Sequence, residues 1–108
     1  MPIYNKLVRD KILEIIELDG LKYSARILEP QELFVEVKKK MIEEAEEFYR
    51  SDKVQDSVEE LADILELIHT AINTLDISIE ELEIIREQKK KKRGGFDKAI
   101  YLIDVEDK

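Results

Sequence analysis

The chain has 108 residues, the size of one domain, so residues 1–108 are expected to share a single core. It contains no cysteine and one histidine, which excludes disulfides and thiolate zinc sites and leaves oxygen as the main metal ligand. Its formal net charge of −8 argues against a general binder of nucleic acid or of anionic membranes.

The sequence also bears on where the protein works. No apolar run reaches the roughly 18 residues that a membrane-spanning helix needs. The opening residues 1–8 are short and mixed in polarity, unlike a secretory leader. We therefore expect a cytoplasmic protein.

The first predicted elements are a helix and a strand. Apolar residues take on helical spacing from about Arg9 onward, and Asp19-Gly20 ends this pattern. Residues 21–28 then alternate in polarity between Gly20 and Pro30. That alternation predicts a β-strand.

Two long helices are predicted next. Residues 31–50 repeat apolar side chains at intervals of three and four, until Ser51-Asp52 interrupts the pattern. Its apolar stripe comprises Phe34, Val37, Met41, Ala45 and Phe48. Residues 54–75 form the second helix, which is apolar over most of its circumference. Because such a helix needs more neighbours than a short chain provides, we expect a homodimer or a higher homo-oligomer.

The remaining residues are predicted to form one more helix and a second strand. Ser78 and Glu81 have the spacing of a capping box, and Gly94-Gly95 ends the helix that they begin. Residues 99–105 are β-branched and aromatic enough for a strand that pairs with residues 21–28. The expected fold is thus mostly α, a helical bundle with a small two-stranded β ribbon and a core completed by oligomerisation.

Acidic residues on the first long helix fall into two groups on a helical wheel. Glu44 lies beside the apolar stripe, and Glu47 lies about 60° further round. Glu43 and Glu46 project to the opposite, solvent side by the same count. Glu44 and Glu47 are therefore predicted to form an i, i+3 pair at the boundary of the core.

The second long helix repeats this arrangement. Glu60 lies within its broad apolar arc and Asp63 at the edge, whereas Glu59 and Glu66 point outward. The short connection at residues 51–53 makes the two helices antiparallel neighbours. The two inward pairs are therefore expected to face each other.

Crowded carboxylates predict a metal site. Ionised carboxylates at a helix interface repel one another, at a cost of several kcal/mol, unless cations neutralise them. Oxygen ligands suit Mg²⁺ or Mn²⁺, which share the rest of their coordination shell with water and substrate phosphates. The alternative is a solvated acidic face paired with the lysines at 38–40. It accounts well for the outward acids and poorly for two inward i, i+3 pairs.

The acidic pattern is also a family signature. Glu43-Glu44-Ala45-Glu46-Glu47 is followed, after twelve residues, by Glu60-Leu61-Ala62-Asp63. This pattern resembles the hallmark of the all-α nucleoside triphosphate pyrophosphohydrolases, the MazG-like superfamily that includes phosphoribosyl-ATP pyrophosphohydrolase. Residues 4–12 and 92–96 are similar to stretches of the phosphoribosyl-ATP pyrophosphohydrolase-like branch.

The resemblance implies that residues 1–108 form one nucleotide pyrophosphohydrolase domain. It would need Mg²⁺ and split a nucleoside triphosphate, ribose or deoxyribose, into monophosphate and pyrophosphate. The implied catalytic residues are Glu43, Glu44, Glu47, Glu60 and Asp63, and the last four are the implied metal ligands. Because the opening signature is an N-terminal addition relative to the histidine-pathway enzyme, house-cleaning of non-canonical or surplus nucleotides is favoured over phosphoribosyl-ATP pyrophosphohydrolase activity.

Basic residues near both ends are candidates for binding the phosphates. Release of pyrophosphate needs cations that absorb charge on the leaving group, and glycine backbone can approach a ligand closely. The predicted substrate-binding residues are Asn5, Lys6, Arg9, Lys11, Arg93, Gly94 and Gly95. Alternatively, Arg9 pairs with Asp10, and the basic run at 89–93 complements a helix C-terminus that glycine caps.

Two rival functions remain open. Glu66 and His69 have the spacing that carboxylate-bridged di-iron bundles use, and a homodimer would supply two such motifs. The other rival is a helical dimerisation or regulatory module without catalysis, which predicts no metal binding.

Overall fold

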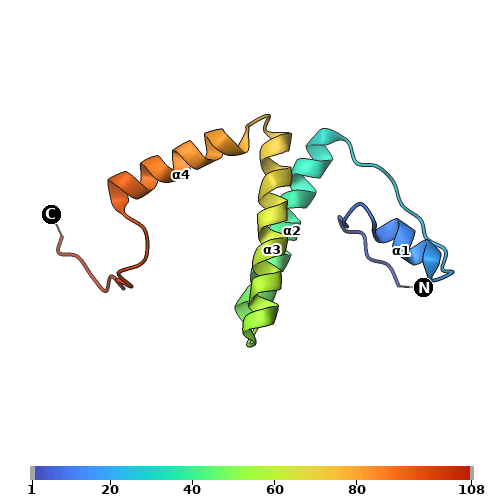
Figure 1. Cartoon of the computed structure of the whole chain (residues 1–108), viewed down its shortest axis with the longest axis horizontal. Helices are drawn as coiled ribbons and strands as arrows, with labels where there is room; N and C mark the ends of the chain where they lie inside the picture. Colours follow the sequence, from blue (N-terminus) through green and yellow to red (C-terminus); the bar gives the residue numbers. More distant parts are fainter. Residues whose placement is uncertain (1, 108) are drawn as a thin grey trace. The chain divides into compact units, whose positions relative to one another are not determined.

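The computed structural model describes residues 2–107, which hold four α-helices (Figure 1). These are α1 (Ile12–Leu18), α2 (Pro30–Arg50), α3 (Val54–Thr74) and α4 (Ile79–Arg93). The chain divides into two compact units, one that ends at Ile77 and contains α1 to α3, and one that begins at Ser78 and contains α4. Within the described residues, no helix combines the length and the apolar character needed to cross a membrane.

The predicted β ribbon is wrong, and the fold of the described residues is all-α. Neither residues 21–28 nor residues 99–105 form a strand, and residues 2–107 contain no strand elsewhere. The two segments belong to different compact units. Alternating and β-branched residues favour extended backbone, but a ribbon of two strands is marginal by itself because nothing covers its face.

The start of α2 is fixed by local chemistry. Pro30 occupies the first turn, where its missing N–H leaves no hydrogen bond unmade. The backbone N–H of Glu29 donates to the Glu32 carboxylate at 3.2 Å, and the Arg26 guanidinium donates to both Glu32 oxygens at 2.8 and 3.2 Å. The hydrogen bonds from Arg26, and next that from Glu29, lower the pKa of Glu32 to about 2.

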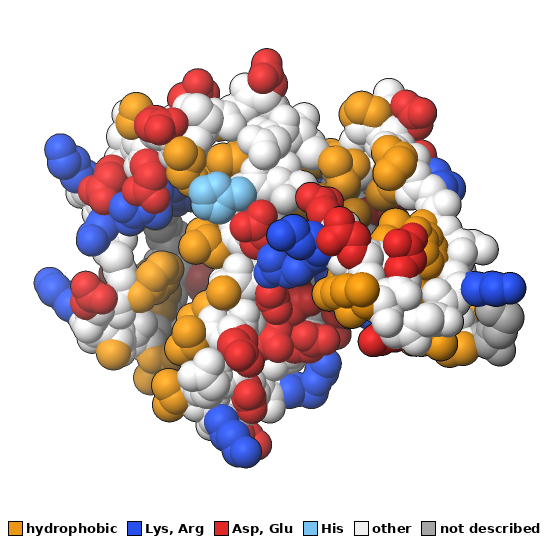
Figure 2. All heavy atoms as spheres, turned by 45° about the vertical axis from the view of Figure 1, so that its right-hand side comes forward, with side chains coloured by type: hydrophobic (Ala, Val, Ile, Leu, Met, Phe, Trp, Pro, Cys, Tyr) orange, Lys and Arg blue, Asp and Glu red, His pale blue; other side chains and the backbone are white. Residues whose placement is uncertain are grey.

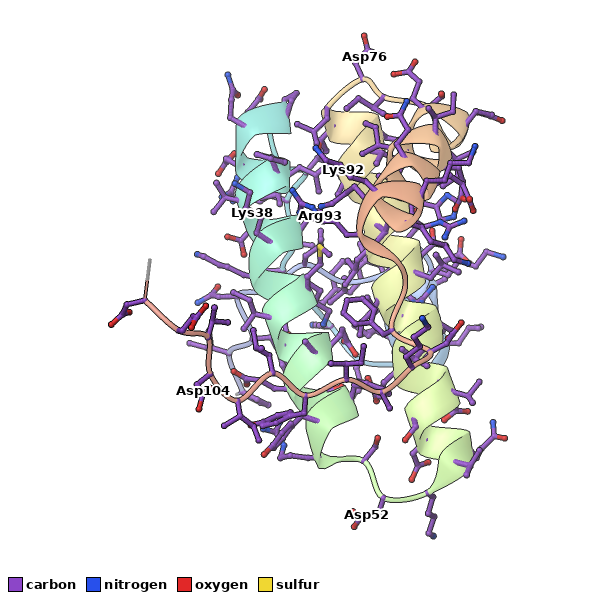
Figure 3. The ribbon with its side chains drawn as sticks, turned by 90° about the vertical axis from the view of Figure 1, so that its left-hand side faces the viewer. Lys38, Asp52, Asp76, Lys92, Arg93 and Asp104 are labelled. Carbon is purple, nitrogen blue, oxygen red and sulfur yellow. The ribbon has the colours of Figure 1, made fainter. Side chains whose placement is uncertain are left out.

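Helices α2 and α3 pack against each other as an antiparallel pair (Figure 1). Residues 51–53 connect them, and Asp52 and Asp76 mark the two ends of the pair in Figure 3. The Ser51 hydroxyl donates to the Phe48 carbonyl at 2.7 Å and lies 2.6 Å from the Ser57 hydroxyl. The turn is therefore tied to the last residues of α2 and the first residues of α3.

The end of α3 is a compact cap. Asp76 has a φ of +56°, the left-handed conformation that usually favours glycine. The Asp76 N–H donates to the Asn73 carbonyl at 3.2 Å, and the Ile77 N–H donates to the Ile72 carbonyl at 2.9 Å. These are the two hydrogen bonds of a Schellman motif, so the last carbonyls of α3 are satisfied.

The second unit confirms the predicted ends of its helix. The Ser78 hydroxyl accepts a hydrogen bond from the Glu81 N–H at 3.1 Å, which caps the start of α4. Gly94 has a φ of +83°, and its N–H donates to the Lys90 carbonyl at 2.7 Å. Lys92 and Arg93 lie in the last turn of this helix (Figure 3).

The buried face of α2 is rotated from the predicted apolar stripe. Val37 is fully buried and Phe34 and Met41 are half-buried, as predicted, but Ala45 and Phe48 are exposed, and Glu44 is only 7% exposed. Buried or half-buried positions recur in α2 at Leu33, Val37, Lys40, Glu44 and Glu47. In α3 they recur at Ser57, Glu60, Ile64, Leu67, Ala71 and Thr74. We call these two series, which alternate steps of three and four, the seam of the α2–α3 pair.

Candidate metal centre

Carboxylates from both helices gather at the end of the seam next to the connection. One group is Glu43, Glu44 and Glu47, and the other is Glu44, Glu60 and Asp63. In each group, one oxygen from every residue lies within 4.8 Å of the others. Glu44 belongs to both groups and links them into an acidic cluster, although Glu47 is grouped with Glu44 and not with Glu60 or Asp63.

Glu44 is the most buried member of this cluster. Its Oε2 atom is buried and has no hydrogen-bond partner among residues 2–107, and its Oε1 atom lies 3.8 Å from the Lys40 ammonium. Burial raises the pKa of Glu44 to about 8, and the nearby carboxyl groups of Glu60 and Glu47 add to this effect. At neutral pH, therefore, Glu44 holds a proton when no cation is bound.

The donor set fits a divalent cation. Glu60 also has a buried Oε2 atom without a hydrogen-bond partner in the described chain. Buried polar atoms are almost always paired, and these two oxygens on facing helices lack the partner that a bound cation, or the proton of Glu44, would supply. All the donors are carboxylate oxygens, which suit Mg²⁺ or Mn²⁺. Within the described residues, neither Glu66 nor His69 belongs to the acidic groups, and the di-iron alternative, which needs a second copy of the chain, stays a prediction.

Two basic residues from the segment before α1 lie on this acidic cluster. The Arg9 Nη2 atom lies 2.5 Å from Asp63 Oδ1, and the Lys6 Nζ atom lies 3.5 Å from Glu43 Oε1. The hydrogen bond to Asp63 is the main reason that the pKa of Arg9 is raised. Arg9 thus bonds to an acid on α3 rather than to its neighbour Asp10. Figure 2 shows acidic side chains crowded on one face of the molecule with basic side chains among them.

The predicted orientation of Glu43 is wrong. The helical wheel turned this side chain to solvent, but it is half-buried and lies between the ammonium groups of Lys6 and Lys40. Although burial opposes the change, the charges of Lys40 and Lys6 lower the pKa of Glu43. The wheel placed Glu43 relative to an apolar stripe that is rotated in the structure, which accounts for the error.

Lys40 was expected only in the alternative interpretation, as one of the lysines that pair with acids on a solvated face, and its burial was not predicted. Its side chain is 19% exposed, and its Nζ atom lies 3.4 Å from Glu43 Oε2 as well as 3.8 Å from Glu44 Oε1. The available signal was the spacing, because Lys40 is three residues after Val37 and four before Glu44, in step with the seam. A lysine at such a position places a positive charge inside the helix pair.

The other predicted residues have no ion pair or hydrogen bond to the acidic cluster among the described residues, or lie in the second unit. Asn5 has a φ of +44° and lies beside Lys6, and Lys11 is the exposed N-cap of α1, with no ion pair to the described residues. Arg93, Gly94 and Gly95 belong to the unit that begins at Ser78, so their role in binding substrate stays a prediction. The outward acids Glu46, Glu59 and Glu66 are exposed.

No protein-family model, curated protein or solved structure matches the chain. The resemblance to the MazG-like superfamily therefore rests on the residue patterns alone. The case for a metal centre rests on the convergence of carboxylates from α2 and α3.

Proposed function

We propose that the chain is a Mg²⁺-dependent nucleoside triphosphate pyrophosphohydrolase, which converts a ribo- or deoxyribonucleoside triphosphate into monophosphate and pyrophosphate. The observation that carries this proposal is the convergence of Glu44, Glu60 and Asp63 from two helices, with buried, unpartnered oxygens on Glu44 and Glu60. The type of reaction is supported by the resemblance of the acidic motif, because a carboxylate cluster alone does not select the phosphorus that is attacked.

The acids of the cluster would hold the metal. Glu44, Glu47, Glu60 and Asp63 are the proposed ligands, and Mg²⁺, when bound, supplies positive charge that polarises the phosphate oxygens. Glu44 gives up its proton on binding, since a carboxylate binds a cation in its ionised form. The ligands stand on two packed helices, so they are held in place before the substrate arrives.

Residues around the cluster would bind the substrate and orient the attacking water. Arg9 and Lys6 lie at its edge, where their charges can bind phosphate oxygens that the metal does not neutralise. The lysines beside Glu43 keep this carboxylate ionised, so it can accept a hydrogen bond from the attacking water and orient it. House-cleaning of non-canonical or surplus nucleotides is the proposed biological role.

A homodimer or higher homo-oligomer is part of this proposal. Helix α3 carries Val58, Leu61 and Leu65 at steps of three and four, and these side chains are 48 to 54% exposed. A second copy that covered them would bury an apolar face that is otherwise exposed to solvent. Light scattering at micromolar concentration should show at least a dimer, and a stable monomer would contradict this.

The decisive experiment is a panel of ribo- and deoxyribonucleoside triphosphates with Mg²⁺, scored for pyrophosphate and for orthophosphate. We expect monophosphate and pyrophosphate from at least one nucleotide, and loss of turnover in Glu60→Gln but not in its exposed neighbour Glu59→Gln. Products of diphosphate and orthophosphate would contradict attack at the α-phosphorus. No turnover, together with a melting temperature that Mg²⁺ and Mn²⁺ leave unchanged, would support the non-catalytic module.

A further inference from the structure

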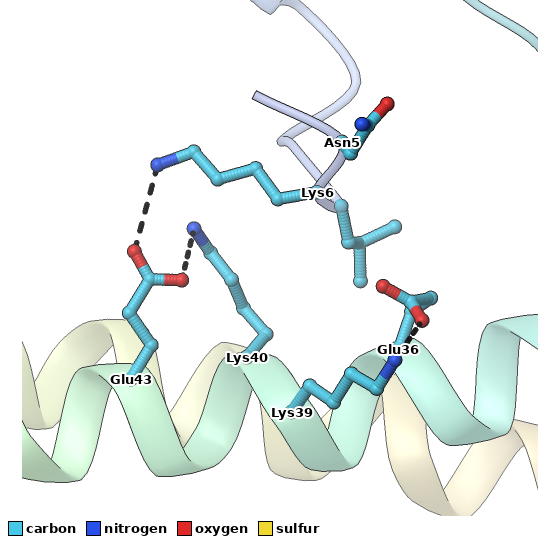
Figure 4. Close-up of a pocket in the computed structure, with 7 residues that line it drawn as sticks. Asn5, Lys6, Glu36, Lys39, Lys40 and Glu43 are labelled. Carbon is cyan, nitrogen blue, oxygen red and sulfur yellow. Dashed lines mark hydrogen bonds and ion pairs between the residues drawn. The ribbon is translucent and has the colours of Figure 1, made fainter. Parts of the chain in front are cut away.

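A small cavity separates the N-terminal segment from α2 (Figure 4). It has a volume of about 140 Å³, and both walls belong to the first compact unit. Its polar lining consists of Asn5, Lys6, Glu36, Lys39, Lys40 and Glu43. In Figure 4, Lys6 and Lys40 extend from opposite walls toward the same carboxylate, that of Glu43.

The lining holds an excess of positive charge. It contains three ammonium groups and two carboxylates. Lys39 pairs with Glu36 at 3.2 Å, and Lys6 and Lys40 share the carboxylate of Glu43, at 3.5 and 3.4 Å, while Lys40 also lies 3.8 Å from Glu44 Oε1, outside the lining. Each ammonium has three donors, so both lysines keep at least one donor beyond these ion pairs. The lysine pair can therefore bind a second anion without giving up Glu43.

The cavity adjoins the candidate metal centre. Glu43 lines the cavity and also belongs to an acidic group with Glu44 and Glu47. The Lys40 ammonium lies 3.8 Å from Glu44 Oε1, and its side chain is only 19% exposed. Because water screens a half-buried charge less, Lys40 attracts an anion more strongly than a surface lysine does. An anion held here would lie next to a cation held by Glu44.

The size of the cavity limits what can bind. Sites for whole drug-sized ligands typically occupy about 300 to 1,000 Å³, so this cavity, of about 140 Å³, holds only a part of a nucleoside triphosphate. One or two phosphate groups are much smaller and carry the charge that lysines recognise as point charges. A polyphosphate could have one end on the metal and the other on the lysines.

We propose that Lys6 and Lys40 form a pyrophosphate subsite beside the metal centre. Its part in catalysis rests on the proposed function. In that reaction the water oxygen bonds to the α-phosphorus, the bond from this phosphorus to the bridging oxygen breaks, and one water proton is released to solvent. The electron pair of the broken bond leaves with the pyrophosphate, so negative charge grows where the two ammonium groups lie.

The test is the affinity for inorganic pyrophosphate, measured by calorimetry on the full chain, both with saturating Mg²⁺ and with EDTA. Lys40→Gln should raise the dissociation constant about tenfold or more, and the more exposed Lys6→Gln should raise it less. Lys38→Gln is the matched control. It removes the same charge from the same helix, but the Lys38 ammonium lies over the Phe34 ring at 4.1 Å, and the residue does not line the cavity.

The outcomes separate the subsite from the enzyme. Equal pyrophosphate affinity in Lys40→Gln, Lys38→Gln and the unchanged protein would overturn the subsite, as would no pyrophosphate binding at all. Mg²⁺ titration of the same proteins tests the metal centre independently. If Mg²⁺ binds but pyrophosphate affinity does not depend on the lysines, only the subsite proposal is refuted. If pyrophosphate binds in EDTA through the lysines but Mg²⁺ does not bind, the subsite is supported and the proposed function is overturned. If Lys40→Gln lowers the melting temperature, the pyrophosphate affinity of Lys6→Gln, whose residue lies on an exposed segment, still tests the subsite.

Discussion

The two ends of the α2–α3 seam have the same spacing and opposite chemistry. Away from the connection the seam is lined mainly by apolar residues such as Leu33, Val37 and Ala71. Next to the connection the same steps of three and four carry Lys40, Glu44 and Glu60. Burial removes hydrocarbon from water at one end, which stabilises the fold, and at the other it removes carboxylates from water, which raises the pKa of Glu44. The difference shows that burial along one helix pair stabilises the fold at one end and changes the acidity of a carboxyl group at the other.

The largest expected effect comes from removing acids at the charged end. Glu44→Gln, Glu47→Gln, Glu60→Gln and Asp63→Asn should each lower Mg²⁺ affinity and turnover about 100-fold or more, because each removes a charged metal ligand and keeps its shape. In EDTA, Glu47→Gln and Glu60→Gln should raise the free energy of unfolding, since fewer like charges are crowded together, whereas Glu44 is already neutral at pH 7 and Asp63 is paired with Arg9. Calorimetric Mg²⁺ titration and urea denaturation measure the two effects.

The controls for this prediction are acids on the exposed sides of the same helices. Glu46→Gln and Glu59→Gln should leave turnover within a few fold, as expected for solvated side chains. If inward and outward substitutions were equally harmless, the assignment of the metal centre would be wrong.

A substitution at the apolar end of the seam should change the free energy of unfolding in the opposite direction, toward lower stability. Ile72 follows the seam residue Ala71 and is the buried residue of α3, at 7% exposed, so Ile72→Ala should lower the free energy of unfolding by about 2 to 4 kcal/mol through lost burial and the cavity left behind. The loss should be the same with Mg²⁺ and with EDTA, as urea denaturation in both conditions would show. A loss that appeared only without Mg²⁺ would mean that the two ends are not independent.

A smaller effect is expected from pH in the absence of metal. The folded state raises the pKa of Glu44 from 4.5 to about 8, so between these values the folded protein holds a proton that the unfolded chain has lost. The free energy of unfolding in EDTA should therefore fall as pH rises through this range, and Glu44→Gln should flatten that dependence. Mg²⁺ affinity should rise over the same range, because Glu44 binds the cation as a carboxylate. Denaturation at a series of pH values tests this, and a rise in stability toward pH 8 would contradict it.

The smallest expected effect concerns Arg9. Arg9→Ala removes a positive charge that pairs with Asp63, so Mg²⁺ should bind up to about fivefold more tightly, the limit for an exposed ion pair. Arg26→Ala, which breaks an ion pair at the start of α2, should leave Mg²⁺ affinity unchanged. Calorimetry compares the two variants. Weaker Mg²⁺ binding in Arg9→Ala would show instead that Arg9 positions Asp63 for the cation.

The sequence predicted the two long helices to within a residue because strong local signals bound them. Pro30 opens α2, and the polar residues at 51–53 separate it from α3. The strands failed because pairing depends on distant segments, which local alternation does not report. The predicted stripe was rotated because a wheel that weighs only apolar side chains does not recognise a buried seam through Lys40, Glu44 and Glu47.

The candidate site was predictable where its signal was local. Two i, i+3 acidic pairs and a short connection were enough to predict that Glu44 and Glu60 lie close together. The bond between Arg9 and Asp63 joins residues 54 positions apart, and no periodicity in either segment indicates it. The positions of Lys40 and Glu43 depended on which face of α2 is buried, and this is the feature that hydrophobic spacing alone placed incorrectly.

The short connection at residues 51–53 holds the residues of the acidic cluster close to one another. Glu47 and Glu60 lie only a few residues from it on either side, so the chain itself keeps mutually repelling groups within reach of one another. The apolar end has no such tether and stays together by burial alone. The connection thus lies at the end of the helix pair where the side chains repel one another. It keeps the carboxylates close together before any cation binds.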